Sequence, residues 1–157
     1  MKHTYLATKT NPTTLIVHCS DPRFQPAFNC FSNRELNTTQ DQAVPIIIAG
    51  GPASLANPIM AKEKQFLSGQ IVFLLKHFPS INMLALINHE DCGFYKQIPN
   101  PEERINREKE DMPTVARAIT GRIASEEIKG VEVAAFYAGF ADTDRNKIVF
   151  EKIQAAE

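Results

Sequence analysis

Five short apolar runs alternate with longer segments of helical character, and this alternation constrains the fold more than any other feature. The runs cover residues 14–18, 44–48, 83–87, 131–137 and 147–150. They are rich in β-branched and other apolar residues and are bounded by polar, glycine or proline residues, which is typical of strands. The first three lack an alternation of apolar and polar residues, which predicts strands covered on both faces.

Helices are expected between these strands. Two Asn-Pro pairs, at residues 57–58 and 100–101, are helix start signals, because asparagine caps the first turn and proline fits the first helical position. The apolar pattern of residues 59–78 is helical. The charged stretch 102–111 predicts a mostly solvated helix, and residues 112–129 form a further element that Gly130 closes.

Strands that alternate with helices predict an α/β fold with a mainly parallel sheet of about four or five strands, flanked by helices. The chain has 157 residues, of which 43% are hydrophobic, so it can bury one full core. We therefore expect a single domain over residues 1–157, in which residues 1–12 form a flexible or extended arm.

Charge and cysteine content narrow the choice of partner and compartment. The net charge is −1, which gives no electrostatic case for a nucleic-acid or membrane partner. The polar first residues predict no signal peptide, and no apolar run approaches a membrane span. Three cysteines without such a signal favour the reducing cytoplasm, where cysteines near a histidine indicate a metal or catalytic site more often than a disulfide.

Candidate metal ligands follow two of the predicted strands. Cys19 follows the first strand directly, with Asp21 and Arg23 just beyond it, and His89 and Cys92 follow the third strand. In an open α/β sheet, functional groups gather at the carboxyl ends of the strands. Two thiolates and one imidazole would leave a fourth tetrahedral position open, which is the arrangement of a catalytic zinc ion.

Each of these residues also has an ordinary structural interpretation. A single cysteine is most often a small buried apolar residue, and an Asp–Arg pair is often a loop salt bridge of little energetic value. The metal interpretation prevails because the five residues would otherwise converge by chance. Cys30 is expected to be packed and not a ligand, and His18 should face away from Cys19. Glu90 and Asp91 are expected to be solvated, although either could support a ligand.

Two of these segments resemble the motifs of one enzyme family. Residues 19–23, Cys-Ser-Asp-Pro-Arg, resemble the C-x-D-x-R motif of β-carbonic anhydrases, and residues 89–93 resemble their H-x-x-C-G motif. The Ala-Gly-Gly at residues 49–51 also agrees, and the resemblance spans roughly residues 14–150. One departure is Ile47-Ile48, where the family usually has Arg-Asn, and it could alter a dimer interface or a pocket wall.

The resemblance implies a zinc enzyme that reversibly hydrates carbon dioxide to bicarbonate. Cys19, His89 and Cys92 would hold Zn²⁺. Asp21, held by Arg23, would orient the attacking oxygen or, in a closed form, become a fourth ligand. It further implies a homodimer or homotetramer. Two alternatives remain open: hydrolysis of carbonyl sulfide or carbon disulfide at the same site, and a non-catalytic zinc-binding regulatory protein, which Ile47-Ile48 favours.

Overall fold

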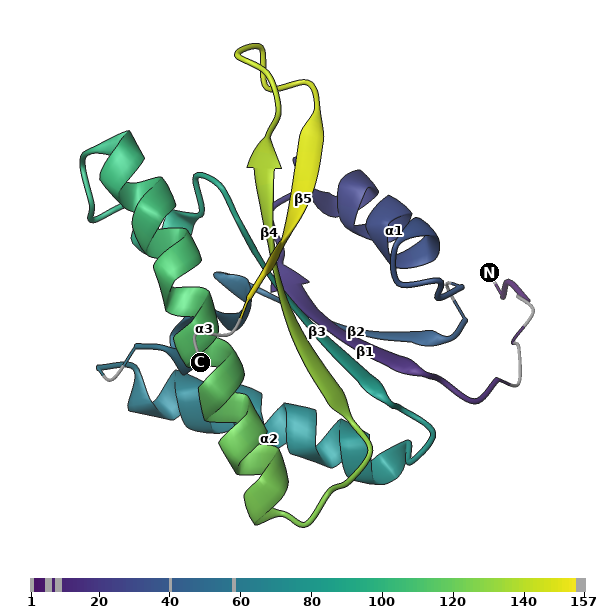
Figure 1. The fold of residues 1–157 in the computed structure, drawn as a ribbon. Helices are drawn as coiled ribbons and strands as arrows, with labels where there is room; N and C mark the ends of the chain where they lie inside the picture. Colours follow the sequence, from purple (N-terminus) through teal and green to yellow (C-terminus); the bar gives the residue numbers. More distant parts are fainter. Residues whose placement is uncertain (1, 5–6, 8–9, 40, 58, 155–157) are drawn as a thin grey trace.

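A computed structural model describes residues 2–4, 7, 10–39, 41–57 and 59–154 (Figure 1). Its centre is a five-stranded sheet in the order β2-β1-β3-β4-β5, in which only β5 runs antiparallel to its neighbour. The strands are β1 (Thr14–Cys19), β2 (Ala43–Ile48), β3 (Met83–His89), β4 (Glu132–Phe140) and β5 (Ile148–Ile153). The helices are α1 (Gln25–Arg34), α2 (Ala61–His77) and α3 (Pro101–Ser125), with short 3₁₀ helices η1 (Gly51–Leu55) and η2 (Gly93–Tyr95). The predicted α/β class is confirmed.

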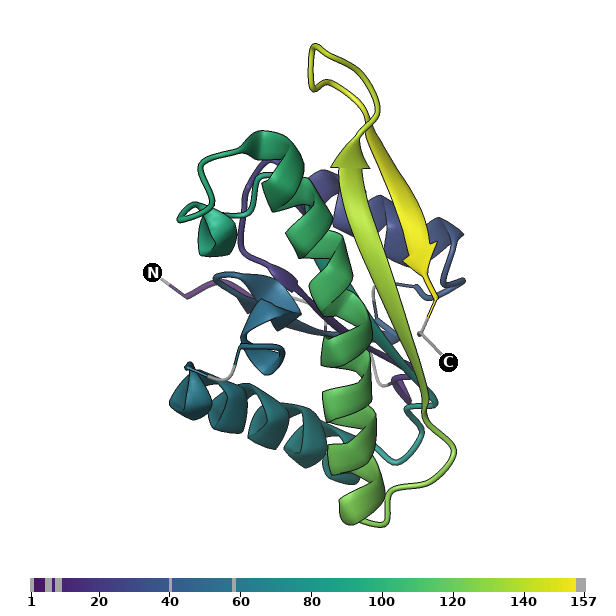
Figure 2. The same ribbon diagram turned by 60° about the vertical axis from the view of Figure 1, so that its left-hand side comes forward.

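Helices cover both faces of this sheet. Helix α1 lies on one face, whereas α2 and α3 lie on the other, as the two views show (Figures 1 and 2). The core is divided accordingly. Leu67, Ile71 and Ile119 pack in the cluster on the α2–α3 face, and Phe28 and Phe31 pack in the cluster on the α1 face.

The direction of winding reverses after β2. The chain moves from β1 outward to β2 and then returns past β1 to β3. Because parallel crossovers are right-handed, this reversal puts successive helices on opposite faces of the sheet. It leaves a crevice beyond the carboxyl ends of β1 and β3, which is where functional groups gather in an open α/β sheet.

Helix α3 differs from the prediction in two respects. It is a single helix of 25 residues, and Pro113 lies inside it without ending it. The side chain of Asn100 caps its start by accepting the Glu102 and Glu103 N–H groups. The charged first half is also not simply solvated, because Glu108 is fully buried. Glu108 lies four residues before Met112, so the two side chains project from the same face of the helix. The buried face of α3 therefore extends into its charged first half.

Strand β2 also departs from the prediction, since it is not covered on both faces. It is an edge strand whose residues are partly or fully exposed, and the Ile47 side chain is 52% exposed. Its apolar sequence resembles that of an interior strand, so the pattern could not indicate an edge. Pro45 is compatible with this place, because an edge strand can lack one ladder donor.

Close packing fixes the turn after β2 against the end of β1. Gly50 and Gly51 both have left-handed backbones, with φ of 78° and 53°. A Cβ on Gly51 would lie 2.9 Å from the Cys19 backbone nitrogen, so only glycine lets these backbones approach so closely. The predicted role of the pair in backbone geometry is therefore consistent with the structure.

Two predictions concern the outer parts of the chain. Residues 1, 5–6 and 8–9 of the expected arm lie outside the described residues, whereas residues 2–4, 7 and 10 are exposed and have no regular secondary structure. Within the described residues, no helix combines the length and apolar character that crossing a membrane requires.

Candidate metal centre

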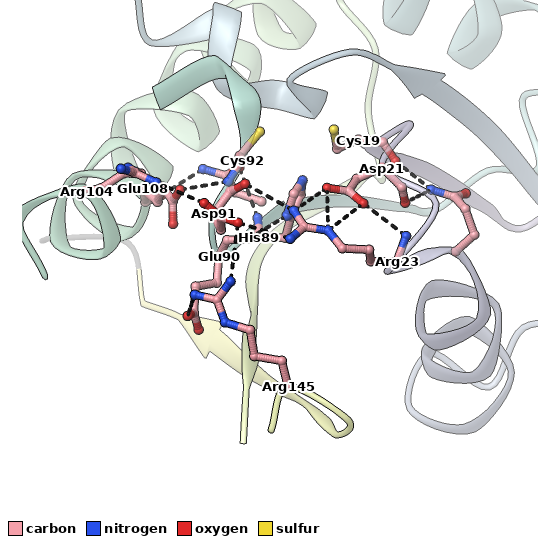
Figure 3. Close-up of polar contacts among 12 residues, drawn as sticks. Cys19, Asp21, Arg23, His89, Glu90, Asp91, Cys92, Arg104, Glu108 and Arg145 are labelled. Carbon is pink, nitrogen blue, oxygen red and sulfur yellow. Dashed lines mark hydrogen bonds and ion pairs between the residues drawn. The ribbon is translucent and has the colours of Figure 1, made fainter. Parts of the chain in front are cut away.

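The two predicted ligand segments meet at the crevice between β1 and β3. Cys19 is the last residue of β1, His89 is the last residue of β3, and Cys92 follows in the next turn. Their ligand atoms lie within 4.8 Å of one another, and all three residues are buried. In Figure 3 the two sulfur atoms lie on the same side of the cluster. The sheet order thus brings together residues that are 70 positions apart in the sequence.

The histidine is oriented for ligation. Its Nδ1 lies 2.9 Å from the Glu90 carbonyl oxygen, to which a protonated Nδ1 donates, and this leaves the lone pair on Nε2. Nε2 is buried and has no hydrogen-bond partner among the described residues. The Phe24 ring, 4.3 Å from the imidazole, helps to fix its plane. Metal-binding histidines typically show this arrangement, with one nitrogen fixed by an acceptor and the other directed at the ion.

The two thiols influence each other's protonation. Interaction with Cys92 lowers the pKa of Cys19, and His89 lowers it further. The same interaction with Cys19, together with burial, raises the pKa of Cys92. One thiolate is therefore favoured already, and a cation between the sulfurs would favour the second by neutralising both. Soft thiolates and an imidazole suit a borderline-soft metal ion, so this group can hold a metal.

Asp21 and Arg23 form a close ion pair beside this group. The Arg23 Nη2 lies 2.7 Å from Asp21 Oδ2, and Nε donates to both carboxylate oxygens. The Arg23 backbone N–H adds a further bond of 3.0 Å to Oδ1. Hydrogen bonding to Arg23 lowers the pKa of Asp21, so this carboxyl group is ionised at neutral pH. The predicted Asp21–Arg23 pair is therefore present beside the ligand group.

An open cleft of about 700 Å³ gives access to these residues. Cys19, Asp21 and Arg23 line it, and its apolar walls include Met60 and Phe94. Ile47 lies elsewhere, in a groove with His18 and Phe28 that opens beside β2. The unusual Ile47 is therefore more relevant to the exposed edge of the sheet than to the wall of this cleft.

Glu90 and Asp91 were expected to be solvated, and the structure shows both in polar networks. Glu90 Oε2 accepts the Phe140 N–H at 2.9 Å, which joins the ligand turn to the end of β4. Asp91 accepts from Arg23 and Arg104 through different carboxylate oxygens. Their partners lie far away in the sequence, so local polarity could not indicate these contacts.

Glu108 supports the ligand turn from α3, and the sequence analysis missed it. Its Oε1 accepts the Cys92 N–H at 3.0 Å, and its Oε2 accepts the Tyr137 hydroxyl at 2.8 Å. Its main-chain oxygen accepts the Asn88 side-chain amide, whose own oxygen accepts the His89 N–H. Burial raises the pKa of Glu108. The signal available in the sequence was its helical spacing from Met112, which the surrounding charges obscured.

The remaining histidine and cysteine near the site have other roles. His18 is buried, packs 4.4 Å from Phe28 and lies on the α1 face, as the strand alternation predicted. Cys30 lies outside the ligand group as expected, but it is exposed on α1, so its predicted packing is wrong. No disulfide links any two of the three cysteines.

Several solved structures resemble the fold of this chain. No protein-family model matches it, and no curated protein matches it either. A β-carbonic anhydrase of the fungal pathogen Aspergillus fumigatus aligns with a TM-score of 0.61 and 13% identity, over 94% of this chain and 77% of its own. The β-carbonic anhydrase isoform I of the protozoan Trichomonas vaginalis gives a TM-score of 0.56 and 13% identity, covering 97% and 87%.

A tetrameric β-carbonic anhydrase of the filamentous ascomycete Sordaria macrospora aligns with a TM-score of 0.51 and 14% identity, over 90% of this chain and 81% of that one. Identities this low establish the fold alone. The chain therefore has a β-carbonic anhydrase-like fold, as the motif resemblance predicted, and a buried Cys-His-Cys group that can bind a metal ion.

The contacts of Glu108 predict a large loss of stability when its carboxylate is removed. Glu108→Ala leaves two buried donors, on Cys92 and Tyr137, without an acceptor. It should lower the free energy of unfolding by about 3 kcal/mol or more, whereas Tyr137→Phe should cost about 1 kcal/mol. Urea unfolding of the metal-free protein in reducing buffer measures both. Glu110→Ala, on the exposed side of α3, is the matched control and should change stability by less than about 0.5 kcal/mol.

Equal losses for Glu108→Ala and Tyr137→Phe would contradict this account, because the bond to Cys92 would then contribute nothing.

Proposed function

We propose that this chain is a zinc-dependent enzyme that interconverts carbon dioxide and bicarbonate, with the ion held by Cys19, His89 and Cys92. One observation carries the proposal: three buried ligand atoms converge within 4.8 Å, and the histidine nitrogen among them has no other partner in the described part of the chain. The β-carbonic anhydrase-like fold and the adjacent Asp21–Arg23 pair support the same reaction.

The ligand set suits the ion in charge as well as in geometry. Two thiolates would balance the charge of a divalent cation at this buried position, and the neutral imidazole would complete three protein ligands. Bound there, zinc would lower the pKa of a coordinated water to about 7, so that the water ionises near neutral pH. Glu108 and Glu90 would keep the ligands in place through the Cys92 N–H and His89 Nδ1 contacts.

Asp21 is proposed to act on the attacking oxygen. As an ionised carboxylate it accepts a hydrogen bond and so fixes the direction of the oxygen lone pair, while Arg23 holds the carboxylate in place through Nε and Nη2. The apolar walls of the cleft, which include Met60 and Phe94, suit a small nonpolar substrate. Arg23 also competes with the metal for Asp21, which would otherwise be available as a fourth ligand.

A homodimer or homotetramer is also proposed. Several large apolar side chains lie exposed on separate elements, including Phe66 and Phe73 of α2, Ile47 of β2 and Val149 of β5. The Sordaria macrospora enzymes that this chain resembles in structure are tetrameric. Light scattering at micromolar concentration should give two or four times the mass of one chain. A monomer under these conditions would contradict the proposal.

Metal analysis combined with a rate assay tests the reaction. The wild type should bind about one zinc ion per chain and hydrate carbon dioxide in a stopped-flow assay. Cys92→Ser should lose most of the zinc and the activity, because one of three ligands is gone. Cys30→Ser is the matched control, since this exposed thiol lies outside the ligand group and its loss should change neither.

The same zinc-loaded protein should be assayed with carbonyl sulfide and carbon disulfide. Faster hydrolysis of these compounds than hydration of carbon dioxide would assign the alternative substrate. No turnover of any of them by fully loaded protein would leave a non-catalytic zinc protein.

Asp21 and Arg23 should affect the rate without affecting metal content. Asp21→Ala should keep its zinc and lower the hydration rate by about 100-fold, because one positioned acceptor is lost. Arg23→Ala should also keep its zinc and lose activity, because Asp21 is then free to occupy the open position on the metal. Asp144→Ala, in the exposed turn after β4, serves as the control. Rates equal to the wild type in both variants would reduce the pair to a loop salt bridge.

A further inference from the structure

Asp91 is the point at which arginines from three separate segments converge. Arg23, from the loop after β1, donates through Nη1 to Asp91 Oδ2 at 3.0 Å. Arg104, from α3, donates to Oδ1 at 2.9 Å, and Arg145, from the β4–β5 turn, lies 3.5 Å from Oδ2. Figure 3 shows Arg145 reaching toward this turn from the β4–β5 hairpin. Both carboxylate oxygens of Asp91 are therefore engaged by cations.

Arg23 is consequently held on two sides. Its Nε and Nη2 bind Asp21, while Nη1 binds the Asp91 carboxylate and Nη2 also approaches the Asp91 carbonyl oxygen at 3.3 Å. The guanidinium is planar, so fixing the edge that faces Asp91 determines where the edge that faces Asp21 lies. The Arg23 side chain is 43% exposed, and without this second contact it could leave Asp21 for solvent.

Asp91 is itself well anchored. Its side chain is 24% exposed, and that of Arg104 is 16% exposed. Arg104 is fixed in turn by its Nε bond to the Ile98 carbonyl oxygen at 3.1 Å. Asp91 has a left-handed backbone with φ of 59°, a conformation that aspartate and asparagine tolerate better than most residues. A continuous line of contacts thus runs from α3 through Asp91 and Arg23 to Asp21.

We propose that Asp91 is a positioning residue, which holds Arg23 in the orientation that keeps Asp21 off the metal. The inference rests on the proposed metal site, but it concerns a residue that does not touch the ligand atoms or the substrate. Without the Asp91 carboxylate, Arg23 would lose its second contact and release Asp21, and the freed carboxylate would compete for the open position on the ion.

The competition can be measured without turnover by titrating azide into the cobalt-loaded protein and following its visible absorption. Asp91→Asn removes the charge, keeps a residue that accepts the left-handed backbone, and turns an amide N–H₂ toward the arginines. It should weaken azide binding by about tenfold, because Asp21 then occupies the position that azide needs. Asp144→Asn makes the same chemical change in the exposed β4–β5 turn and should leave azide binding unchanged.

The decisive comparison uses the Asp21→Ala background. If Asp91 acts through Arg23 and Asp21, then Asp91→Asn should have no effect on azide binding there. An effect of equal size in both backgrounds, or none in either, would overturn the proposal. Arg104→Gln provides a second variant should Asp91→Asn fold poorly, and it should weaken azide binding in the same background-dependent way.

Failure of the proposed reaction has a different signature. If the wild type takes up no cobalt, the metal site is wrong and the positioning role is overturned with it. If cobalt binds and the azide pattern appears, but carbon dioxide is not hydrated, the reaction is wrong and the role of Asp91 stands.

Discussion

The reversal of winding between β2 and β3 is the constraint on which the rest of the structure depends. Because the right-handed crossovers from β1 to β2 and from β2 to β3 run in opposite directions across the sheet, α1 covers one face and α2 the other, and a crevice forms beyond the carboxyl ends of β1 and β3. Cys19 and His89 are the last residues of these two neighbouring strands. Gly51 packs closely against the Cys19 backbone, so the turn after β2 forms a third side of this crevice.

The sequence predicted those parts of the site whose determinants are local. The apolar runs 14–18 and 83–87 were sufficient to place the candidate ligands Cys19 and His89 at strand ends, and Cys92 follows in the next turn. Supporting residues could not be found in this way. Glu108 is buried because its oxygens meet donors from Cys92 and Tyr137, which lie 16 and 29 positions away in the chain. Its helical spacing from Met112 was the one local signal, and the charged neighbours obscured it.

The edge position of β2 was missed for a related reason. Whether a strand is covered on both faces depends on its position in the strand order, which is set by the crossovers and not by its own residues. An apolar edge strand is a surface that natural proteins usually cover or blunt. The exposure of Ile47 therefore agrees with the proposed self-association. A partner copy covering this strand would account for an apolar sequence that is typical of interior strands.

Two kinds of carboxylate support the ligands, and they contribute differently. Glu108 is fully buried, so its hydrogen bonds contribute directly to the stability of the fold. The ion pairs around Asp91 are partly exposed, and such pairs typically stabilise a protein by less than about 1 kcal/mol each. That small energy is nevertheless sufficient for a choice between two partners. Each 1.4 kcal/mol changes a ratio of populations about tenfold, so in the proposed metal-bound protein modest contacts on Arg23 would decide whether Asp21 stays with the arginine or moves to the metal.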